Sequence, residues 1–238
     1  MKFLLFILLM FPTSLIASSS CPQIRIGLVD TGLNLNDPRL KPHLCPTGHK
    51  NFVEHETLND VNGHGTFVAG LIEQNAGKAN YCLLIYKYYQ ADVPGIVNEQ
   101  RELEAFQEAI DNGASVINFS AGGPNFNEKE SVLIKNNPRV TFVVASGNEH
   151  SNLDIPGNEF YPASLFLDNE KVVESIDENG KISKFSNYSI KAYKELGENV
   201  LSYLPYGGYT NNSGTSFATA IFTGKLVDKL SKSCNSGK

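Results

Sequence analysis

The sequence predicts an α/β fold, in which a mostly parallel central sheet carries helices on both of its faces. Segments rich in β-branched and aromatic residues alternate along the chain with segments whose apolar residues recur at helical spacing. In such an order each strand returns to the same direction through a helix, which builds a parallel sheet covered on both sides. No internal repeat or linker divides residues 22–238, so we expect a single domain.

The individual elements follow from local patterns. Residues 24–30 begin with alternating apolar and polar side chains and then become apolar, which favours a strand. Residues 140–145 are mostly β-branched or aromatic, which favours a second strand. Residues 99–112 place apolar side chains on one helical face and stop before Gly113, which is typical of an amphipathic helix. Further strands are expected at 81–89, 114–120, 172–177 and 200–204, and further helices at 65–74, 129–136 and 216–229.

The composition excludes several classes of protein. The chain has 238 residues, of which 41% are hydrophobic and 19% charged, and its formal net charge is −5. This is an ordinary globular balance without a basic run, so nucleic acid is not an expected partner. Beyond the N-terminal segment, no apolar run approaches the roughly 18 residues that a membrane-spanning helix needs.

Residues 1–20 have the layout of a secretory signal peptide. Lys2 precedes the apolar run 3–11, and small polar residues close the segment. We therefore expect a secreted or periplasmic protein whose folded part is residues 22–238. A membrane anchor and a lipid on Cys21 are the alternatives. The apolar run is short for a membrane span, and the residues before Cys21 fit a lipid-attachment site poorly.

The chain has four cysteines, which are Cys21, Cys45, Cys82 and Cys234. In an oxidising compartment an even number favours two disulfides, and all three connectivities stay open at this point. Buried free thiols are the alternative. A zinc site is not expected, because no two cysteines lie at close ligand spacing.

Three short segments each place one reactive side chain among small residues. In chain order they are residues 27–32 with Asp30, residues 62–66 with His64, and residues 213–218 with Ser216. Each alone is an ordinary turn, loop or helix cap. Together they fit nucleophilic catalysis, because a serine hydroxyl needs a base to attack an amide, and that base needs a third group to orient it.

The order Asp, His, Ser with these flanks, together with a fourth segment at 146–148, resembles the subtilisin family of serine proteases. The resemblance implies a subtilisin-like three-layer sandwich and a serine-type endopeptidase that works through an acyl-enzyme intermediate. It assigns the nucleophile to Ser216, the general base to His64 and the orienting carboxylate to Asp30. It also assigns a side-chain donor of the oxyanion hole to Asn148.

The resemblance further marks where a peptide substrate would bind. Residues 118–124 are similar to the family's substrate-binding strand, along which an extended peptide pairs edge-on. The substrate-binding residues implied are Ser120, Ala121, Gly122, Ser146, Gly147 and Phe160. Two hypotheses concern specificity. Phe160 shortens the primary pocket and favours small residues there, or Glu149 attracts a basic residue at its rim.

The chain departs from the family pattern before Asp30 and again at residues 74–80. Secreted subtilisins usually carry a folding propeptide, but only a short stretch separates Cys21 from Asp30. The protein therefore folds without one, uses a separate inhibitor or chaperone chain, or belongs to a compact branch. The linker at residues 74–80 is short where many relatives have a calcium-binding loop. We therefore expect no cofactor, and bound calcium is the alternative.

The expected partners are protein or peptide substrates, and the expected state is a monomer. The alternative from another class is a catalytically silent, subtilisin-like protein that binds peptides. An unrelated esterase lacks support, because no Gly-x-Ser-x-Gly elbow surrounds Ser216.

Overall fold

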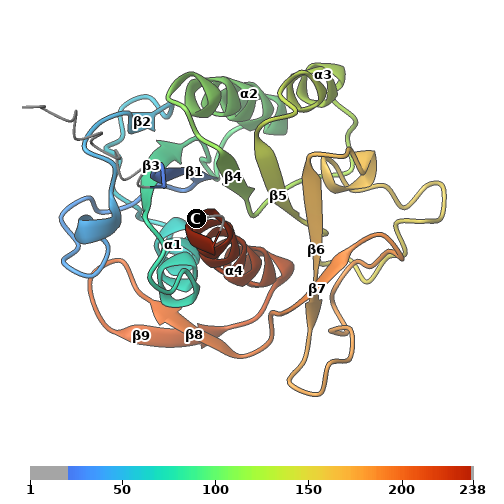
Figure 1. The fold of residues 1–238 in the computed structure, drawn as a ribbon. Helices are drawn as coiled ribbons and strands as arrows, with labels where there is room; N and C mark the ends of the chain where they lie inside the picture. The colour runs from blue at the N-terminus through green and yellow to red at the C-terminus, as the bar shows by residue number, and fades with distance from the viewer. Residues whose placement is uncertain (1–20, 237–238) are drawn as a thin grey trace, which may run out of the picture.

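A parallel sheet forms the centre of the molecule (Figure 1). The computed structural model describes residues 21–236, so the signal peptide expected at 1–20 lies outside the described residues. Within them, seven strands run in the order β2-β3-β1-β4-β5-β6-β7, and every neighbouring pair is parallel. The strands are β1 (Ile24–Asp30), β2 (Lys50–Asn51), β3 (Tyr81–Lys87), β4 (Val116–Phe119), β5 (Thr141–Ala145), β6 (Glu170–Ile176) and β7 (Tyr193–Leu196).

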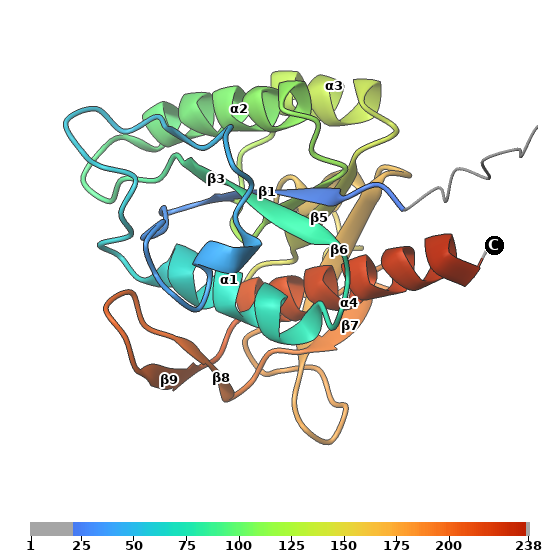
Figure 2. The ribbon, with the colours of Figure 1, turned by 60° about the vertical axis from the view of Figure 1, so that its left-hand side comes forward.

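Helices cover both faces of this sheet, as Figure 2 shows. They are α1 (His64–Asn75), α2 (Gly95–Asp111), α3 (Glu128–Asn136) and α4 (Thr215–Ser236), with short 3-10 turns η1 (Lys41–His43) and η2 (Ala163–Leu165). One apolar core joins α1 and α4 to the sheet, and a second core joins α2 and α3 to the opposite face. The predicted α/β fold with a covered parallel sheet is therefore confirmed.

The sequence patterns located the buried elements better than the polar ones. The strand expected at 200–204 exists as β8 (Val200–Tyr203), but it pairs antiparallel with β9 (Tyr209–Asn212) outside the main sheet. The edge strands β2 and β7 were not expected, because they are short and largely polar and so lack the apolar pattern of a buried strand. Within residues 21–236 no helix is long and apolar enough to cross a membrane.

The strand order brings three loops to one edge of the sheet. Strands β1, β4 and β5 are neighbours, and all three point the same way. Asp30 ends β1, Ser120 directly follows β4, and Ser146 directly follows β5. The carboxyl ends of these strands therefore place residues far apart in the chain side by side, as parallel sheets generally do.

Two glycines let α1 and α4 approach their neighbours closely on one face of the sheet. A Cβ at Gly224 of α4 would lie 2.7 Å from the carbonyl oxygen of Ile72 in α1. A Cβ at Gly70 of α1 would lie 2.4 Å from Oγ of Ser202 in β8. Any side chain at these positions would force the elements apart, so both glycines fix how the two helices sit.

Both cysteine pairs form disulfides, and the connectivity left open by the sequence is Cys21–Cys234 and Cys45–Cys82. The first bond joins the start of the described chain to the end of α4, across a sequence separation of 213 residues. The second joins the segment before β2 to β3, across 37 residues. Cys45 and Cys82 are each 2% exposed, whereas Cys234 is exposed to solvent.

We predict that the two disulfides differ in their response to reductant. A mild reductant should open Cys21–Cys234 in the folded protein, whereas Cys45–Cys82 should require denaturant, because access of the attacking thiolate limits the exchange. Loop-closure entropy gives a loss of unfolding free energy of roughly 5 kcal/mol for the long loop and roughly 4 kcal/mol for the short one. Alkylation with mass spectrometry, and unfolding of the two double-serine variants, would check this. Equal reduction of both bonds without denaturant would contradict it.

Candidate active site

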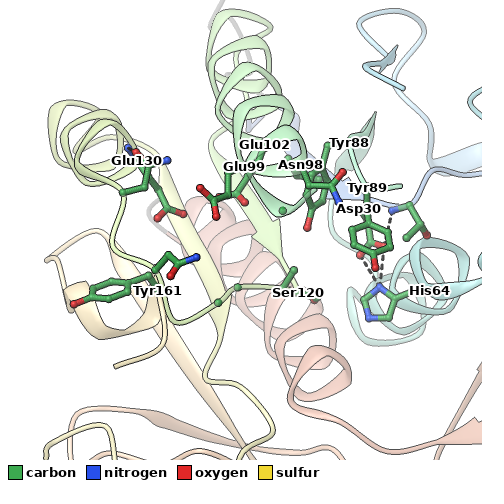
Figure 3. A pocket seen from close by; sticks show the side chains of 18 of the residues that line it. Asp30, His64, Tyr88, Tyr89, Asn98, Glu99, Glu102, Ser120, Glu130 and Tyr161 are labelled. Carbon is green, nitrogen blue, oxygen red and sulfur yellow. Dashed lines mark hydrogen bonds and ion pairs between the residues drawn. The ribbon is translucent and has the colours of Figure 1, made fainter. Parts of the chain in front are cut away.

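Asp30 and His64 form a direct pair at the carboxyl edge of the sheet (Figure 3). Nδ1 of His64, the first residue of α1, lies 2.8 Å from Oδ1 and 3.0 Å from Oδ2 of Asp30 at the end of β1. The carboxylate is 4% exposed, and the backbone N–H of Thr31 donates to its Oδ1 at 2.7 Å. The carboxylate thus fixes which ring nitrogen of His64 carries the proton, and the other nitrogen is left to act as a base.

The glycines on either side of His64 allow the start of α1 to lie close to the end of β1. Gly63 has φ of 98°, a left-handed conformation that other residues adopt at a cost. A Cβ at Gly65 would lie 2.4 Å from the carbonyl oxygen of Gly32. The small residues in the segments 27–32 and 62–66 therefore let the start of α1 lie against the end of β1.

Asp60 anchors the loop that leads into α1, and the sequence analysis did not single it out. This carboxylate is 1% exposed. Its oxygens accept hydrogen bonds from the N–H groups of Asn62, Gly63 and Thr66 and from the hydroxyls of Thr31 and Thr66, at 2.7 to 3.1 Å. An aspartate three positions before a glycine is a turn signal that could have identified it.

A buried lysine supports the same loop. Lys87, which lies opposite Asp30 in the sheet register, is 2% exposed. Its Nζ donates to the carbonyl oxygens of Thr57 and Asn59 and forms an ion pair with Glu56 at 2.6 Å. The loop between β2 and α1 is therefore tied to the sheet at both Lys87 and Asp60.

Burial and two neighbouring carboxylates shift the pKa of His64 in opposite directions. Burial would by itself lower the pKa of His64. The charge of Asp30, the hydrogen bond to it and the charge of Asp60 together outweigh burial and raise the pKa above its ordinary value. The site therefore stabilises the charged imidazole, which is the form that His64 would take after accepting a proton.

Ser216 lies in the first turn of α4 and faces the segment after β4. Its Oγ donates to the carbonyl oxygen of Ser120 at 2.8 Å, and Oγ of Ser120 donates to the carbonyl oxygen of Ser216 at 2.9 Å. The ring of the next residue, Phe217, lies 5.7 Å from the ring of His64 between centroids. The structure thus brings Asp30 and His64 into contact, while the Ser216 hydroxyl donates to Ser120.

Asn148 is oriented by the residue before Ser216. The N–H and the hydroxyl of Thr215 donate to Oδ1 of Asn148 at 3.0 and 3.1 Å. The amide nitrogen of the exposed Asn148 side chain is therefore left to donate elsewhere. At the start of α4 the N–H of Thr215 thus has a partner in Asn148, and the N–H of Phe217 donates to the carbonyl oxygen of Gly214 at 3.1 Å. The backbone N–H of Ser216 lies between these two in the chain, in the turn where helix N–H groups lack intrahelical partners.

Phe160 occupies the space between the segments that follow β4 and β5. A Cβ at Gly122 would lie 2.4 Å from Cε1 of Phe160, and a Cβ at Gly147 would lie 3.0 Å from its Cδ2. The ring therefore lies against both glycine backbones. This is the position in which a bulky side chain would fill the primary pocket that the resemblance implies.

Asn187 organises the segment after β5 and was also missed by sequence reasoning. It is 1% exposed, and its Oδ1 accepts from the N–H groups of Glu149 and Ser151 at 3.0 and 2.8 Å. Its Nδ2 donates to the carbonyl oxygen of Ser146 at 2.9 Å and to Oε2 of Glu149 at 2.6 Å. The Glu149 carboxylate thus already has a partner within the protein.

A cavity of about 500 Å³ begins at Asp30 and His64 and extends toward α2 and α3. Ser120, Ala121 and Gly122 form part of its wall. Beyond this segment the wall includes Glu99 and Glu102 of α2, Glu130 of α3, and Tyr88, Tyr89 and Tyr161. The cavity is large enough for side chains of an extended peptide lying along 120–123.

The calcium site that the family resemblance raises does not fit the residues present. The connection from α1 to β3 is residues 76–80, which hold no carboxylate. Calcium prefers several oxygen ligands, with carboxylates prominent among them. Within residues 21–236 no group of three or more His, Cys, Asp or Glu side chains has the arrangement to hold a metal ion.

Comparisons with known proteins agree with this geometry. The model of the subtilase family matches residues 22–233. The chain is 31% identical over 224 residues to the major intracellular serine protease of Bacillus subtilis, covering 86% of this chain and 67% of that protein. It is 30% identical over 221 residues to subtilisin DY of Bacillus licheniformis, covering 88% of this chain and 77% of that protein.

Solved structures give the same result for the fold. A cold-adapted subtilisin-like serine proteinase superposes with a TM-score of 0.74 at 25% identity, over 88% of this chain and 76% of that one. A lanthipeptide protease superposes with a TM-score of 0.75 at 23% identity, over 90% of this chain and 74% of that one. From the family match along residues 22–233 and this shared architecture, the chain belongs to the subtilase family, and the resemblance drawn from its three short segments is confirmed.

Proposed function

We propose that the protein is a secreted serine endopeptidase that hydrolyses peptide bonds through an acyl-enzyme intermediate. The observation that carries this proposal is the contact of 2.8 Å between His64 Nδ1 and the buried Asp30 carboxylate, beside the first turn of the helix that holds Ser216. Membership of the subtilase family supports a serine peptidase. The catalytic roles of the individual residues are part of the proposal.

In the first half of the reaction, Ser216 attacks the carbonyl carbon of the scissile bond. Its hydroxyl turns from the Ser120 carbonyl oxygen to His64 Nε2, which takes the proton as the bond from Oγ to carbon forms. His64 then gives that proton to the leaving amine as the carbon–nitrogen bond breaks. Water hydrolyses the resulting ester by the same route, and Ser216 regains its proton.

Two groups stabilise the oxyanion of each tetrahedral intermediate in this scheme. The amide nitrogen of Asn148 is one donor, held in place because Thr215 occupies its Oδ1. The backbone N–H of Ser216 is the other, in the first turn of α4 where N–H groups have no intrahelical partner. The positive end of the helix dipole favours the same negative charge.

The proposed location is outside the cytoplasm, in the periplasm or the medium. Two disulfides support it, because such bonds persist in oxidising compartments. The N-terminal pattern of a signal peptide, read from the sequence alone, points the same way. The proposed partners are protein or peptide substrates.

A second function, peptide binding without catalysis, is favoured by one specific observation. The Ser216 hydroxyl donates to the Ser120 carbonyl oxygen at 2.8 Å. A serine held permanently in this rotamer would leave His64 without a proton to accept. Catalytic hydrogen bonds often form only when substrate is bound, so the endopeptidase remains the function that the site supports best.

We predict that a fluorophosphonate probe labels the mature protein at Ser216. The probe reacts only with a serine that a base has activated, so Ser216→Ala should abolish both labelling and hydrolysis of a quenched peptide library. Gel fluorescence and mass spectrometry of the labelled peptide provide the measurement. Thr210→Ala, in β9 outside the main sheet and outside the cavity wall, serves as a control that keeps labelling. A folded wild-type protein that takes no label would instead support the silent peptide-binding protein.

We predict that kcat/KM rises with pH through a midpoint above the ordinary histidine value. The base must be neutral to accept a proton, and its surroundings raise the pKa of His64, so the rate is lost as pH falls through that raised value. Asp30→Asn should move this midpoint to lower pH and reduce kcat by about 10⁴-fold, a magnitude known from the same change in trypsin. The exposed Glu178→Gln is the charge-matched control. An unmoved midpoint in Asp30→Asn would count against this assignment.

We predict that Phe160 restricts the residue before the scissile bond to small side chains. Phe160→Gly should open the space against Gly122 and Gly147. The kcat/KM ratio for phenylalanine over alanine at this substrate position should then rise about tenfold or more. Profiling with a peptide library measures it, and a wild-type enzyme that already prefers large aromatic residues would disprove the role.

A further inference from the structure

The far end of the cavity is acidic and has no positive charge in its wall. The acidic residues that line the cavity, among the described residues, are Asp30 beside His64 and Glu99, Glu102 and Glu130 at the far end, and none of the lining residues is Lys or Arg. Glu99 and Glu102 lie one helical turn apart on α2, and Glu130 lies on α3. Figure 3 shows the carboxylate of Glu130 directed toward those of Glu99 and Glu102. The two helices therefore face each other with acidic side chains across the end of the cavity.

Glu130 occupies a core-facing position that an apolar residue would normally take. It is 5% exposed and lies one turn before the buried Ile134. Asn127 and Glu130 have the spacing of a capping box, in which the glutamate carboxylate would accept a hydrogen bond from the backbone N–H of Asn127. Only the other half of that box forms, because Asn127 accepts from the N–H groups of Lys129 and Glu130. The Glu130 carboxylate is left to face the cavity.

No donor from outside the acidic group reaches the Glu130 side chain within residues 21–236. Its side-chain hydrogen bond is to Glu102, another carboxyl group. Burial, and then the charge of Glu130, raise the pKa of Glu102 well above its usual range, and burial raises the pKa of Glu130. A buried carboxyl pair without a cation is costly, since each ionised group loses solvation and repels the other. A positive ligand would remove that cost.

We propose that this acidic cavity binds the side chain of a Lys or Arg residue of the peptide substrate, at a position other than the one that meets Phe160. The proposal rests on the proposed function, because it takes the substrate to lie along 120–123, which forms the cavity wall next to His64. The pocket against Phe160 is separate, since neither Phe160 nor Gly147 lines this cavity. Glu102 and Glu130 are then specificity-determining residues of the endopeptidase.

The rest of the wall also fits a long cationic side chain. Tyr88, Tyr89 and Tyr161 supply aromatic surface for its methylene groups and for cation–π contact. The volume of about 500 Å³ exceeds what one hydrated ion needs and matches a side chain that enters along a peptide backbone. A carboxylate pair beside tyrosine rings is thus a better match for guanidinium or ammonium than for an apolar or acidic residue.

The test is substrate profiling of the mature protein with quenched peptides that vary on both sides of the scissile bond. In the wild type, one position away from the bond should favour Lys or Arg over norleucine and citrulline by about tenfold to a hundredfold in kcat/KM, the range expected for a charge-assisted hydrogen bond. Glu102→Gln with Glu130→Gln should reduce this preference to within about threefold of unity, because the pair would then carry no charge. The kcat/KM of the norleucine peptide reports whether that variant is folded.

The matched control removes two glutamates from the same helices outside the cavity. Glu104→Gln with Glu128→Gln removes the same number of carboxyl groups at exposed positions, and it should keep the basic preference. The fluorophosphonate label separates the two proposals. An unlabelled wild type disproves the endopeptidase, whereas a labelled, active wild type without a basic preference overturns only the acidic subsite. A preference that millimolar calcium abolishes and a chelator restores would assign the carboxylates to a metal and overturn it as well.

Discussion

The close packing of α1 against α4 is the constraint on which the site depends. His64 begins α1 and Ser216 lies in the first turn of α4, so the separation of these helices sets the separation of the two side chains. Gly224 allows the contact, because any side chain there would meet the Ile72 carbonyl oxygen. Gly65 does the same at the end of β1, where Asp30 lies. Glycines in helices usually cost stability, and here they are required by the approach of one backbone to another.

Three buried charged residues hold His64 and the loop that precedes it in place. Lys87 holds the loop before α1, Asp60 holds the last residues of that loop, and Asp30 holds the imidazole. Each carboxylate has several donors, so its charge is satisfied before any substrate arrives. The same two carboxylates raise the pKa of His64 against the effect of burial. Rigidity and proton affinity at this histidine therefore have a common origin.

The parts of this architecture that follow local rules could be predicted from the sequence, and the parts that depend on tertiary placement could not. Asp30, His64 and Ser216 stand in short, small-residue segments at the ends of recognisable elements, so pattern and order revealed them. Asp60 and Asn187 lie in polar loops, and their importance comes from donors brought to them by folding. Disulfide connectivity likewise depends on which strands become neighbours. The short polar strands β2 and β7 have no periodic signal of their own.

The charge pattern of the sequence does not reveal that Glu102 and Glu130 line a cavity. In the sequence one looks like a solvated helix position and the other like half of a capping box, yet both line a cavity. Buried acids also occur elsewhere, since Glu170 accepts from the Leu167 N–H and Glu174 accepts from the Ser189 N–H and approaches Lys194. Each of those two carboxylates accepts a hydrogen bond through its Oε2, whereas its buried Oε1 has no hydrogen-bond partner among the described residues. Neither residue lines the cavity, so neither is placed to meet a substrate. Glu102 and Glu130 instead line a cavity of substrate size, and the side-chain hydrogen bond of Glu130 is to Glu102. Two buried acids without a cation are locally unfavourable, and a positively charged ligand in the cavity best explains the arrangement.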